Sequence, residues 1–165
     1  MSEHHFYEPR NGHRLLHDPF KAIVAPRPIG WISSIDLDGR VNLAPYSFFN
    51  AFCEAPPIVG FSSGGRKDSQ RNVEAAGEFV CNLVTSKHAR AMNVTSAPFP
   101  HGVNEFEAAG LAAAPSRLVK PPHVRETSFS TRMGICKPAL PTRLLSRGEI
   151  PGNVDHNNAP EAAEE

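Results

Sequence analysis

The sequence has no excess of charge of either sign, few cysteines and no long apolar run. Lys plus Arg and Asp plus Glu each number 17 in 165 residues, so the composition gives no support for a nucleic-acid or membrane-surface partner. The three cysteines, Cys53, Cys81 and Cys136, form no C-x-x-C pair, which argues against a disulfide framework or a zinc site. No stretch approaches about 20 apolar residues, and the N-terminus has no signal-peptide core. We therefore expect a cytoplasmic protein without a membrane span.

Several motifs of known chemistry are also missing. The chain contains no Gly-x-Ser-x-Gly elbow, no Walker loop and no Gly-x-Gly-x-x-Gly turn, so a hydrolase triad and the common nucleotide-binding loops have no anchor. His13 and His17 have the i, i+4 spacing of helical metal ligands, but no third ligand with a recognisable spacing follows. We expect no metal site.

The residues that are present favour many short elements. The 16 prolines disfavour long helices. Apolar and β-branched residues predict short strands at 32–35, 41–44, 58–61 and 78–84. The pair Asp38-Gly39 predicts a two-residue hairpin between the first two strands. Asp68 or Ser69 is expected to cap a short helix that ends at Gly77. This order of elements favours an α+β or barrel-based fold.

The loop at residues 62–69, Ser-Ser-Gly-Gly-Arg-Lys-Asp-Ser, lies between a predicted strand and a predicted helix. Its glycines and hydroxyls, followed by a helix N-terminus, could bind an anion, and Arg66 and Lys67 add full positive charges. The alternative is a solvated turn with two exposed bases. The sequence leaves both interpretations open.

Two further segments also allow two interpretations each. Residues 45–52 contain a tyrosine and three phenylalanines, which either belong to the core or form a stacking surface, with Ser47 and Asn50 as hydrogen-bonding partners of a flat heterocycle. Arg27 lies between two prolines, so it is either pre-organised for a phosphate or carboxylate, or is a surface residue beside a buried Trp31.

Three motifs in this order carry a family resemblance: Arg-Pro-Ile-Gly-Trp at 27–31, Asn-Leu-Ala-Pro-Tyr-Ser-Phe-Phe-Asn at 42–50, and Ser-x-x-x-Arg-Lys-Asp at 62–68. Over residues 17–124 the chain resembles the flavin-reductase-like, FMN-binding split-barrel family, in its flavoredoxin-like group. The resemblance implies a mainly β fold, a six-stranded antiparallel split barrel with flanking short helices. It also implies a homodimer with FMN near the subunit interface.

The matching motifs imply three sets of cofactor-binding residues. Those expected to border the flavin are Arg27, Pro28, Trp31, Ser33 and Ser34. Those expected along the isoalloxazine ring are Ser47, Phe48, Phe49 and Asn50. Those expected to hold or orient the phosphate are Ser62, Arg66, Lys67, Asp68 and Ser69, with Asn72 as a further candidate on the helix.

The resemblance implies an oxidoreductase that passes hydride from NADH or NADPH to FMN. No catalytic side chain is predicted, because the cofactor carries the hydride chemistry. A redox carrier without reductase turnover, or a family member without function, is the alternative. Neither the final electron acceptor nor a partner oxygenase can be identified.

The C-terminal part departs from the family pattern. We divide the chain into an arm at 1–16, a split-barrel domain at 17–125 and an atypical, partly disordered tail at 126–165. Strand periodicity is lost where that tail begins, which predicts a barrel that is incomplete at its C-terminus, as in a truncated or frame-shifted chain.

Overall fold

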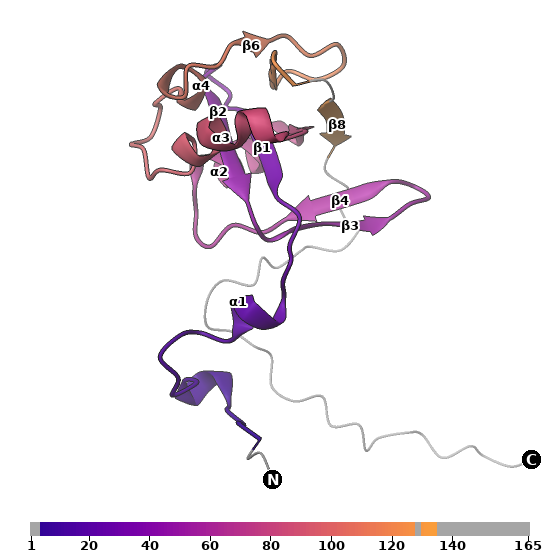
Figure 1. Cartoon of the computed structure of the whole chain (residues 1–165). Coiled ribbons are helices and arrows are strands. Elements are labelled where there is room, and N and C mark those ends of the chain that lie inside the picture. The colour runs from indigo at the N-terminus through magenta and orange to yellow at the C-terminus, as the bar shows by residue number, and fades with distance from the viewer. Residues whose placement is uncertain (1–3, 128–129, 135–165) are drawn as a thin grey trace, which may run out of the picture.

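The computed structural model describes residues 4–127 and 130–134. The helices and 3₁₀ turns are η1 (Pro9–Asn11), α1 (Phe20–Ile23), α2 (Asp68–Ala76), η2 (Ser86–His88), α3 (Ala89–Val94) and α4 (Glu105–Ala108). The strands are β1 (Gly30–Ile35), β2 (Val41–Tyr46), β3 (Phe49–Cys53), β4 (Ile58–Phe61), β5 (Glu78–Asn82), β6 (Ala113–Ala114), β7 (His123–Val124) and β8 (Ser130–Gly134). The expected class, mainly β with short flanking helices, is confirmed (Figure 1).

The main sheet is antiparallel and has the strand order β2-β1-β5-β8. Two separate hairpins, β3-β4 and β6-β7, complete the described strands. Because these strands fall into three sheets, the six-stranded barrel stays a prediction. β8 lies beyond the domain boundary predicted at residue 125 and pairs with β5 along its length, so this part of the C-terminal segment belongs to the sheet. The rest of the predicted tail lies outside the described residues.

The turn between β1 and β2 forms a hairpin of a different type from the one predicted. The N–H of Gly39 donates to the carbonyl of Asp36, so the central residues of the turn are Leu37 and Asp38. Gly39 then follows with a φ of 87°, in the left-handed region that favours glycine. A turn followed by a glycine bulge is another common short hairpin loop, and the Asp38-Gly39 pair is compatible with both.

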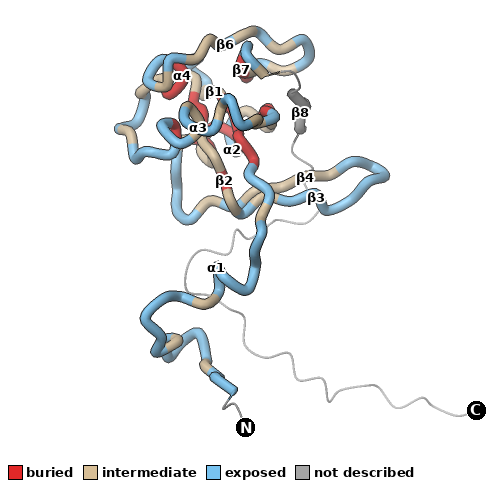
Figure 2. Tube along the Cα trace, viewed as in Figure 1, coloured by how far each residue is buried: buried red, intermediate tan, exposed pale blue. Residues whose placement is uncertain are grey.

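Both faces of β1 are covered, because adjacent residues of a strand point to opposite sides of the sheet. On one face Trp31 packs with Leu43, Phe106 and Val124. On the other face Ile32 packs with a cluster that includes Val73 of α2. Figure 2 shows the buried residues concentrated in this central layer.

The tip of the β3-β4 hairpin and the N-terminal segment extend away from this layer (Figures 1 and 2), whereas Phe49, Val59 and Phe61 of the hairpin pack against its Ile32 cluster. Other large apolar side chains of the two segments are widely exposed: Phe52 by 71%, Ile23 by 74% and Leu16 by 92%. Within the part of the chain that the structure describes, no helix has the length and apolar character needed to cross a membrane.

Helix α2 ends as predicted but begins differently. Gly77 closes it in the left-handed conformation, with φ 75° and ψ 12°. Lys67 occupies the N-cap position and makes no capping hydrogen bond through its side chain, whereas Asp68 is already the first helical residue. The prediction that Asp68 or Ser69 caps the helix is therefore wrong, and among the described residues no side chain caps the N-terminus.

Candidate functional site

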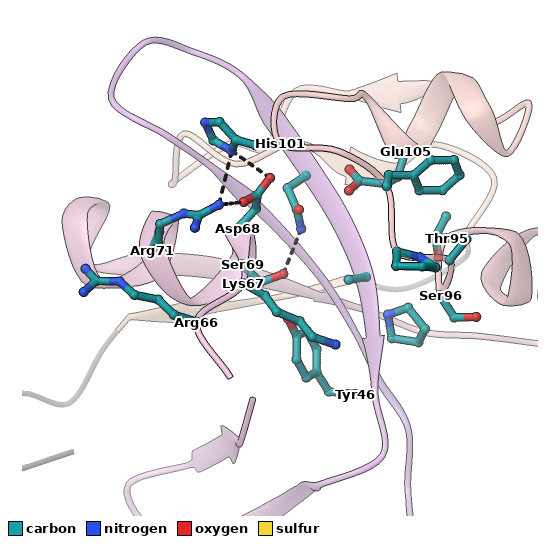
Figure 3. Close-up of a pocket in the computed structure, with 16 residues that line it drawn as sticks. Tyr46, Arg66, Lys67, Asp68, Ser69, Arg71, Thr95, Ser96, His101 and Glu105 are labelled. Carbon is teal, nitrogen blue, oxygen red and sulfur yellow. Dashed lines mark hydrogen bonds and ion pairs between the residues drawn. The ribbon is translucent and has the colours of Figure 1, made fainter. Parts of the chain in front are cut away.

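Two cavities lie on either side of the junction between β2 and β3. The first, which we call the α2 cavity, has a volume of about 310 Å³. It is lined by part of β2, by residues 66–69 and Arg71, by residues 95–99, and by His101 and Glu105 (Figure 3). The second, the hairpin cavity, has a volume of about 410 Å³. It is lined by Val24, residues 26–28, residues 47–50, Phe52 and residues 60–62.

The predicted site residues divide between the two cavities. Four of the residues predicted for the phosphate line the α2 cavity: Arg66, Lys67, Asp68 and Ser69. The hairpin cavity is lined by Arg27, Pro28, Ser47, Phe48, Phe49, Asn50 and Ser62. The structure thus separates a polar, charged group of residues from an aromatic group, and Ser62, which was expected at the phosphate, lies with the aromatic group.

The N-terminus of α2 faces the α2 cavity without a side-chain cap. The first N–H groups of a helix have no partner inside it, and together with the helix dipole they attract anions. Ser69, in the first turn, is buried, and its hydroxyl lies 2.8 Å from the Asn42 amide. Arg66 is largely exposed and lies 3.5 Å from Glu74. The arrangement suits a phosphate or carboxylate group.

The Tyr46 hydroxyl is the clearest unsatisfied group at this cavity. Tyr46 is only 6% exposed, and its buried oxygen has no hydrogen-bond partner among the described residues. Burial raises the pKa of Tyr46 and outweighs the lowering effect of the nearby Ser69 and Ser63 hydroxyls, neither of which is in hydrogen-bonding geometry, so the phenol remains a neutral donor. A buried donor without a partner is costly, and an oxygen atom of a bound ligand would satisfy it.

Glu105 is a buried carboxylate on the other side of the same cavity. Its side chain accepts a hydrogen bond of 3.1 Å from the N–H of Leu43. With the Asn42 amide turned so that its nitrogen lies 3.2 Å from Glu105, the amide oxygen accepts from Ser69 at 2.8 Å. Burial raises the pKa of Glu105. The polar chain from Ser69 to Glu105 fixes the floor of the cavity.

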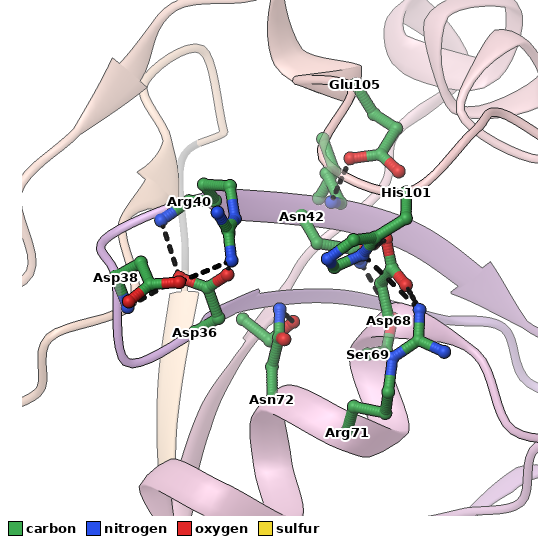
Figure 4. A network of polar contacts seen from close by, with 12 residues as sticks. Asp36, Asp38, Arg40, Asn42, Asp68, Ser69, Arg71, Asn72, His101 and Glu105 are labelled. Atoms are coloured by element: carbon green, nitrogen blue, oxygen red, sulfur yellow. Dashed lines mark hydrogen bonds and ion pairs between the residues drawn. The ribbon is translucent and has the colours of Figure 1, made fainter.

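The carboxylate of Asp68 contacts two basic side chains of the protein. Its carboxylate accepts from Arg71 and lies 2.9 Å from Nδ1 of His101 (Figure 4). Burial would raise the pKa of Asp68, but the hydrogen bond to His101 and the charge of Arg71 outweigh it and lower the pKa overall. Asp68 is therefore an anion in the neutral pH range.

Arg27 donates hydrogen bonds to the backbone of the N-terminal segment. Its Nη1 donates to the carbonyls of Lys21 and Val24, at 2.6 Å each. The guanidinium carbon lies 5.6 Å from the centre of the Phe48 ring, a cation–π contact. Phe48 also stacks with Phe20 of α1, with ring centres 6.1 Å apart. Arg27 thus anchors α1 against the hairpin cavity and has only its Nε buried without a partner.

Trp31, Ser33 and Ser34 line neither cavity and are fully buried, so the structure corrects the expectation that they border a ligand. The Trp31 indole donates to the hydroxyl of Thr95 at 3.0 Å. Ser33 donates to the carbonyl of Pro122 at 2.5 Å, and the Ser34 hydroxyl accepts from Asn72 at 3.2 Å. These side chains have no surface left for a ligand, and Asn72 is likewise a buried structural residue.

Four ionisable residues that line the α2 cavity were not predicted from the sequence: Tyr46, Arg71, His101 and Glu105. Tyr46 belongs to the motif at 42–50. Its polar hydroxyl in an otherwise apolar strand could have identified it as a candidate ligand contact. His101 had no such signal, because it contacts Asp68 across 33 residues of sequence. In the described ranges, His, Cys, Asp and Glu nowhere gather in threes at metal-binding distance.

The antiparallel sheets with short flanking helices are shared with solved structures of the split-barrel class. The crystal structure of nitrilotriacetate monooxygenase component B from Bacillus cereus has this fold, with a TM-score of 0.72 and 28% identity, over 83% of this chain and 70% of that one. The Pseudomonas fluorescens 2-nitrobenzoate 2-nitroreductase is similar with a TM-score of 0.62 and 31% identity, over 67% of this chain and 54% of that one.

The sequence model of the flavin reductase like domain matches residues 24–142, and the chain belongs to this family. An uncharacterized protein of Aquifex aeolicus is 43% identical over 113 residues, which are 66% of this chain and 58% of that protein. A protein of Deinococcus radiodurans is 42% identical over 62% of this chain and 49% of its own length. The chain therefore spans about half the length of the curated relatives it matches.

Proposed function

We propose that the protein is an oxidoreductase of the flavin-reductase type that binds FMN and uses NADH or NADPH as reductant. The observation that carries the proposal is the N-terminus of α2, which faces a cavity with Arg66, Lys67 and the buried hydroxyl of Tyr46; in the part of the chain that the structure describes, neither the helix end nor this hydroxyl has a side-chain partner. These are donors that suit a phosphate ester. When bound, FMN would supply the hydride chemistry, and the residues of this chain would bind and orient it.

The phosphate of FMN would bind in the α2 cavity. Arg66 and Lys67 would supply charge, the first N–H groups of α2 would donate hydrogen bonds, and Tyr46 would donate from its hydroxyl. Ser69 keeps its place through its bond to Asn42, so it orients the helix N-terminus. Asp68 is an anion and would repel a phosphate, so its role is to position its basic partners.

The flavin ring would lie along the hairpin cavity. Phe48, Phe49 and Phe52 give the apolar faces, and Ser47, Asn50 and Ser62 are the polar groups available beside them. A Cβ at Gly30 would lie 2.5 Å from the Phe49 ring, so this glycine allows Phe49 to pack directly on β1. The backbone N–H of Ser62 donates to the carbonyl of Phe48 at 2.8 Å, which fixes the aromatic segment to β4.

Purified protein is expected to be yellow, or to become so on titration with FMN, and to oxidise NADH or NADPH in the presence of FMN. An absorbance spectrum and a nicotinamide oxidation assay test both steps. Yellow protein without nicotinamide oxidation would favour a redox carrier over a reductase. Protein that stays colourless and binds no added FMN would contradict the proposal.

We further propose that the protein works as a homodimer. The support is the exposed apolar surface of α1 and the β3-β4 hairpin, where Ile23 and Phe52 project away from the core. Surface of this kind on a protein marks an interaction site. Sedimentation equilibrium is expected to give twice the chain mass of 18.0 kDa, and a particle of one chain mass at micromolar concentration would contradict the dimer.

A further inference from the structure

Helix α1 lies apart from the central layer and is connected to β1 by a segment with two prolines, Pro26 and Pro28 (Figure 1). In the described structure none of its four residues is buried, and Ile23 is 74% exposed. A helix this short, with so little burial, is not stable by itself. The position of α1 therefore depends on individual contacts with the rest of the protein.

Two of these contacts meet on the ring of Phe48. The ring of Phe20, the first residue of α1, stacks with it at 6.1 Å between centres and an interplanar angle of 27°. The guanidinium carbon of Arg27 lies 5.6 Å from the centre of the same ring. Both contacts are attractive. Because Phe48 lines the hairpin cavity, the side chain that holds α1 also belongs to the wall of that cavity.

Arg27 joins this segment to itself. Its Nη1 donates to the carbonyls of Lys21 and Val24 at 2.6 Å each. These bonds fold residues 20–27, which we call the clasp, into a hook. The second half of the clasp lines the hairpin cavity, whereas the aromatic ring at its first position rests against the aromatic wall of the same cavity.

We propose that the clasp closes one side of the hairpin cavity over a bound flavin ring, and that its opening sets the rate at which flavin leaves. The inference rests on the proposed function, because it assumes that the ring binds in the hairpin cavity. That cavity, of about 410 Å³, has Val24 and Arg27 of the clasp in one part of its lining and Phe48 in another. A ring between them would add contacts that exist only while the clasp is closed.

Opening of the clasp would leave the rest of the fold intact. It breaks the stack of Phe20 on Phe48 and exposes no buried residue of α1. Phe48 keeps its place, because its carbonyl accepts a hydrogen bond of 2.8 Å from the N–H of Ser62. Segments with few buried contacts open locally at a low cost in free energy. Bound flavin would shift the clasp toward its closed arrangement, and the closed clasp would slow release.

Stopped-flow fluorescence of FMN and riboflavin release from the full chain tests the inference. Phe20→Ala removes the stack but changes no residue that lines either cavity, and both flavins are expected to leave about three- to tenfold faster, the effect of one aromatic pair. The equal effect on both flavins distinguishes the clasp from the phosphate site, where loss of Arg66 and Lys67 is expected to affect FMN alone. Phe20→Tyr keeps the stack and is expected to release flavin at the wild-type rate.

Hydrogen exchange of the backbone gives a readout that does not depend on turnover. The N–H of Ile23 donates to the carbonyl of Pro19 at 2.9 Å. The N–H of Val24 donates to the carbonyl of Phe20 at 3.2 Å. An opened α1 would lose these bonds, because it is too short to remain helical alone. Exchange at 20–24 is expected to slow when either flavin binds to the wild type, and to stay fast in Phe20→Ala.

Sedimentation separates the clasp from the proposed dimer, since α1 also carries exposed apolar surface. Phe20→Ala is expected to sediment as the wild type does. Faster release that accompanies dissociation of the variant into single chains would assign the effect to a lost dimer and overturn the clasp.

Phe6→Ala is the matched control, because Phe6 belongs to the same N-terminal segment, is 84% exposed and lines neither cavity. It is expected to behave as the wild type in release and in exchange. Tight FMN binding with release from Phe20→Ala at the wild-type rate would overturn the clasp and leave the proposed function standing. Absence of FMN binding to the wild type would instead overturn the proposed function, and the clasp with it.

Discussion

Replacing Arg66 and Lys67 together with alanine is expected to weaken FMN binding by about a hundredfold. Each charge-assisted contact to a phosphate contributes roughly 1.5–3 kcal/mol, so two contacts at the lower end give about 3 kcal/mol. Folding is not at risk, because Arg66 is exposed and its ion pair with Glu74 is a surface pair of small value. Fluorescence titration of the flavin measures the loss.

Riboflavin separates the phosphate from the ring in this experiment. The double variant is expected to bind riboflavin as the wild type does, because the α2 cavity would contact only the phosphate end. Asn50→Ala is the matched control: Asn50 lines the hairpin cavity, so affinity for FMN and for riboflavin should fall by similar factors. Unchanged FMN affinity in the double variant would show that the phosphate binds elsewhere.

Local patterns predicted β1, β2, β4, β5 and the end of α2, but not β3, β6, β7 or β8. The strand at 58–61 is β4 to the residue, and Gly77 closes α2 in the left-handed conformation. Both depend on neighbours in sequence: a short apolar, β-branched run for the strand, and a residue free to adopt positive φ for the helix end. The same local rules suggested a side-chain cap at Asp68 or Ser69, and there long-range contacts prevailed, since Asp68 bonds to His101 and Ser69 to Asn42.

The site was predictable only in outline. Arg66 and Lys67 line one cavity, and residues 47–50 line the other. The resemblance had assigned these two groups to different parts of the ligand. Burial was not predictable from the motifs, because Ser33 and Ser34 are as polar in sequence as Ser47 and Ser62. Only the fold shows that β1 is covered on both faces by helices and by the segment around Pro122.

Trp31→Ala is expected to destabilise the ligand-free protein by about 3–5 kcal/mol, the usual cost of removing a fully buried large aromatic side chain. Trp31 packs between Leu43, Phe106 and Val124, and its loss would leave a cavity at the centre of the sheet. Urea denaturation without flavin measures the loss as a lower midpoint with an unchanged slope.

Trp31→Phe distinguishes packing from a role in ligand binding. It keeps an aromatic ring in the core but loses the hydrogen bond from the indole to Thr95, so we expect a loss of stability well below that of Trp31→Ala. A residue that bordered the flavin would show the opposite pattern: normal stability of the ligand-free protein, and a loss of flavin affinity in both variants. Trp31 belongs to the same motif as Arg27 and Pro28, which line the hairpin cavity. A loss of stability that is large in Trp31→Ala and small in Trp31→Phe would therefore show that one motif supplies both residues of the cavity and a buried residue of the core behind it.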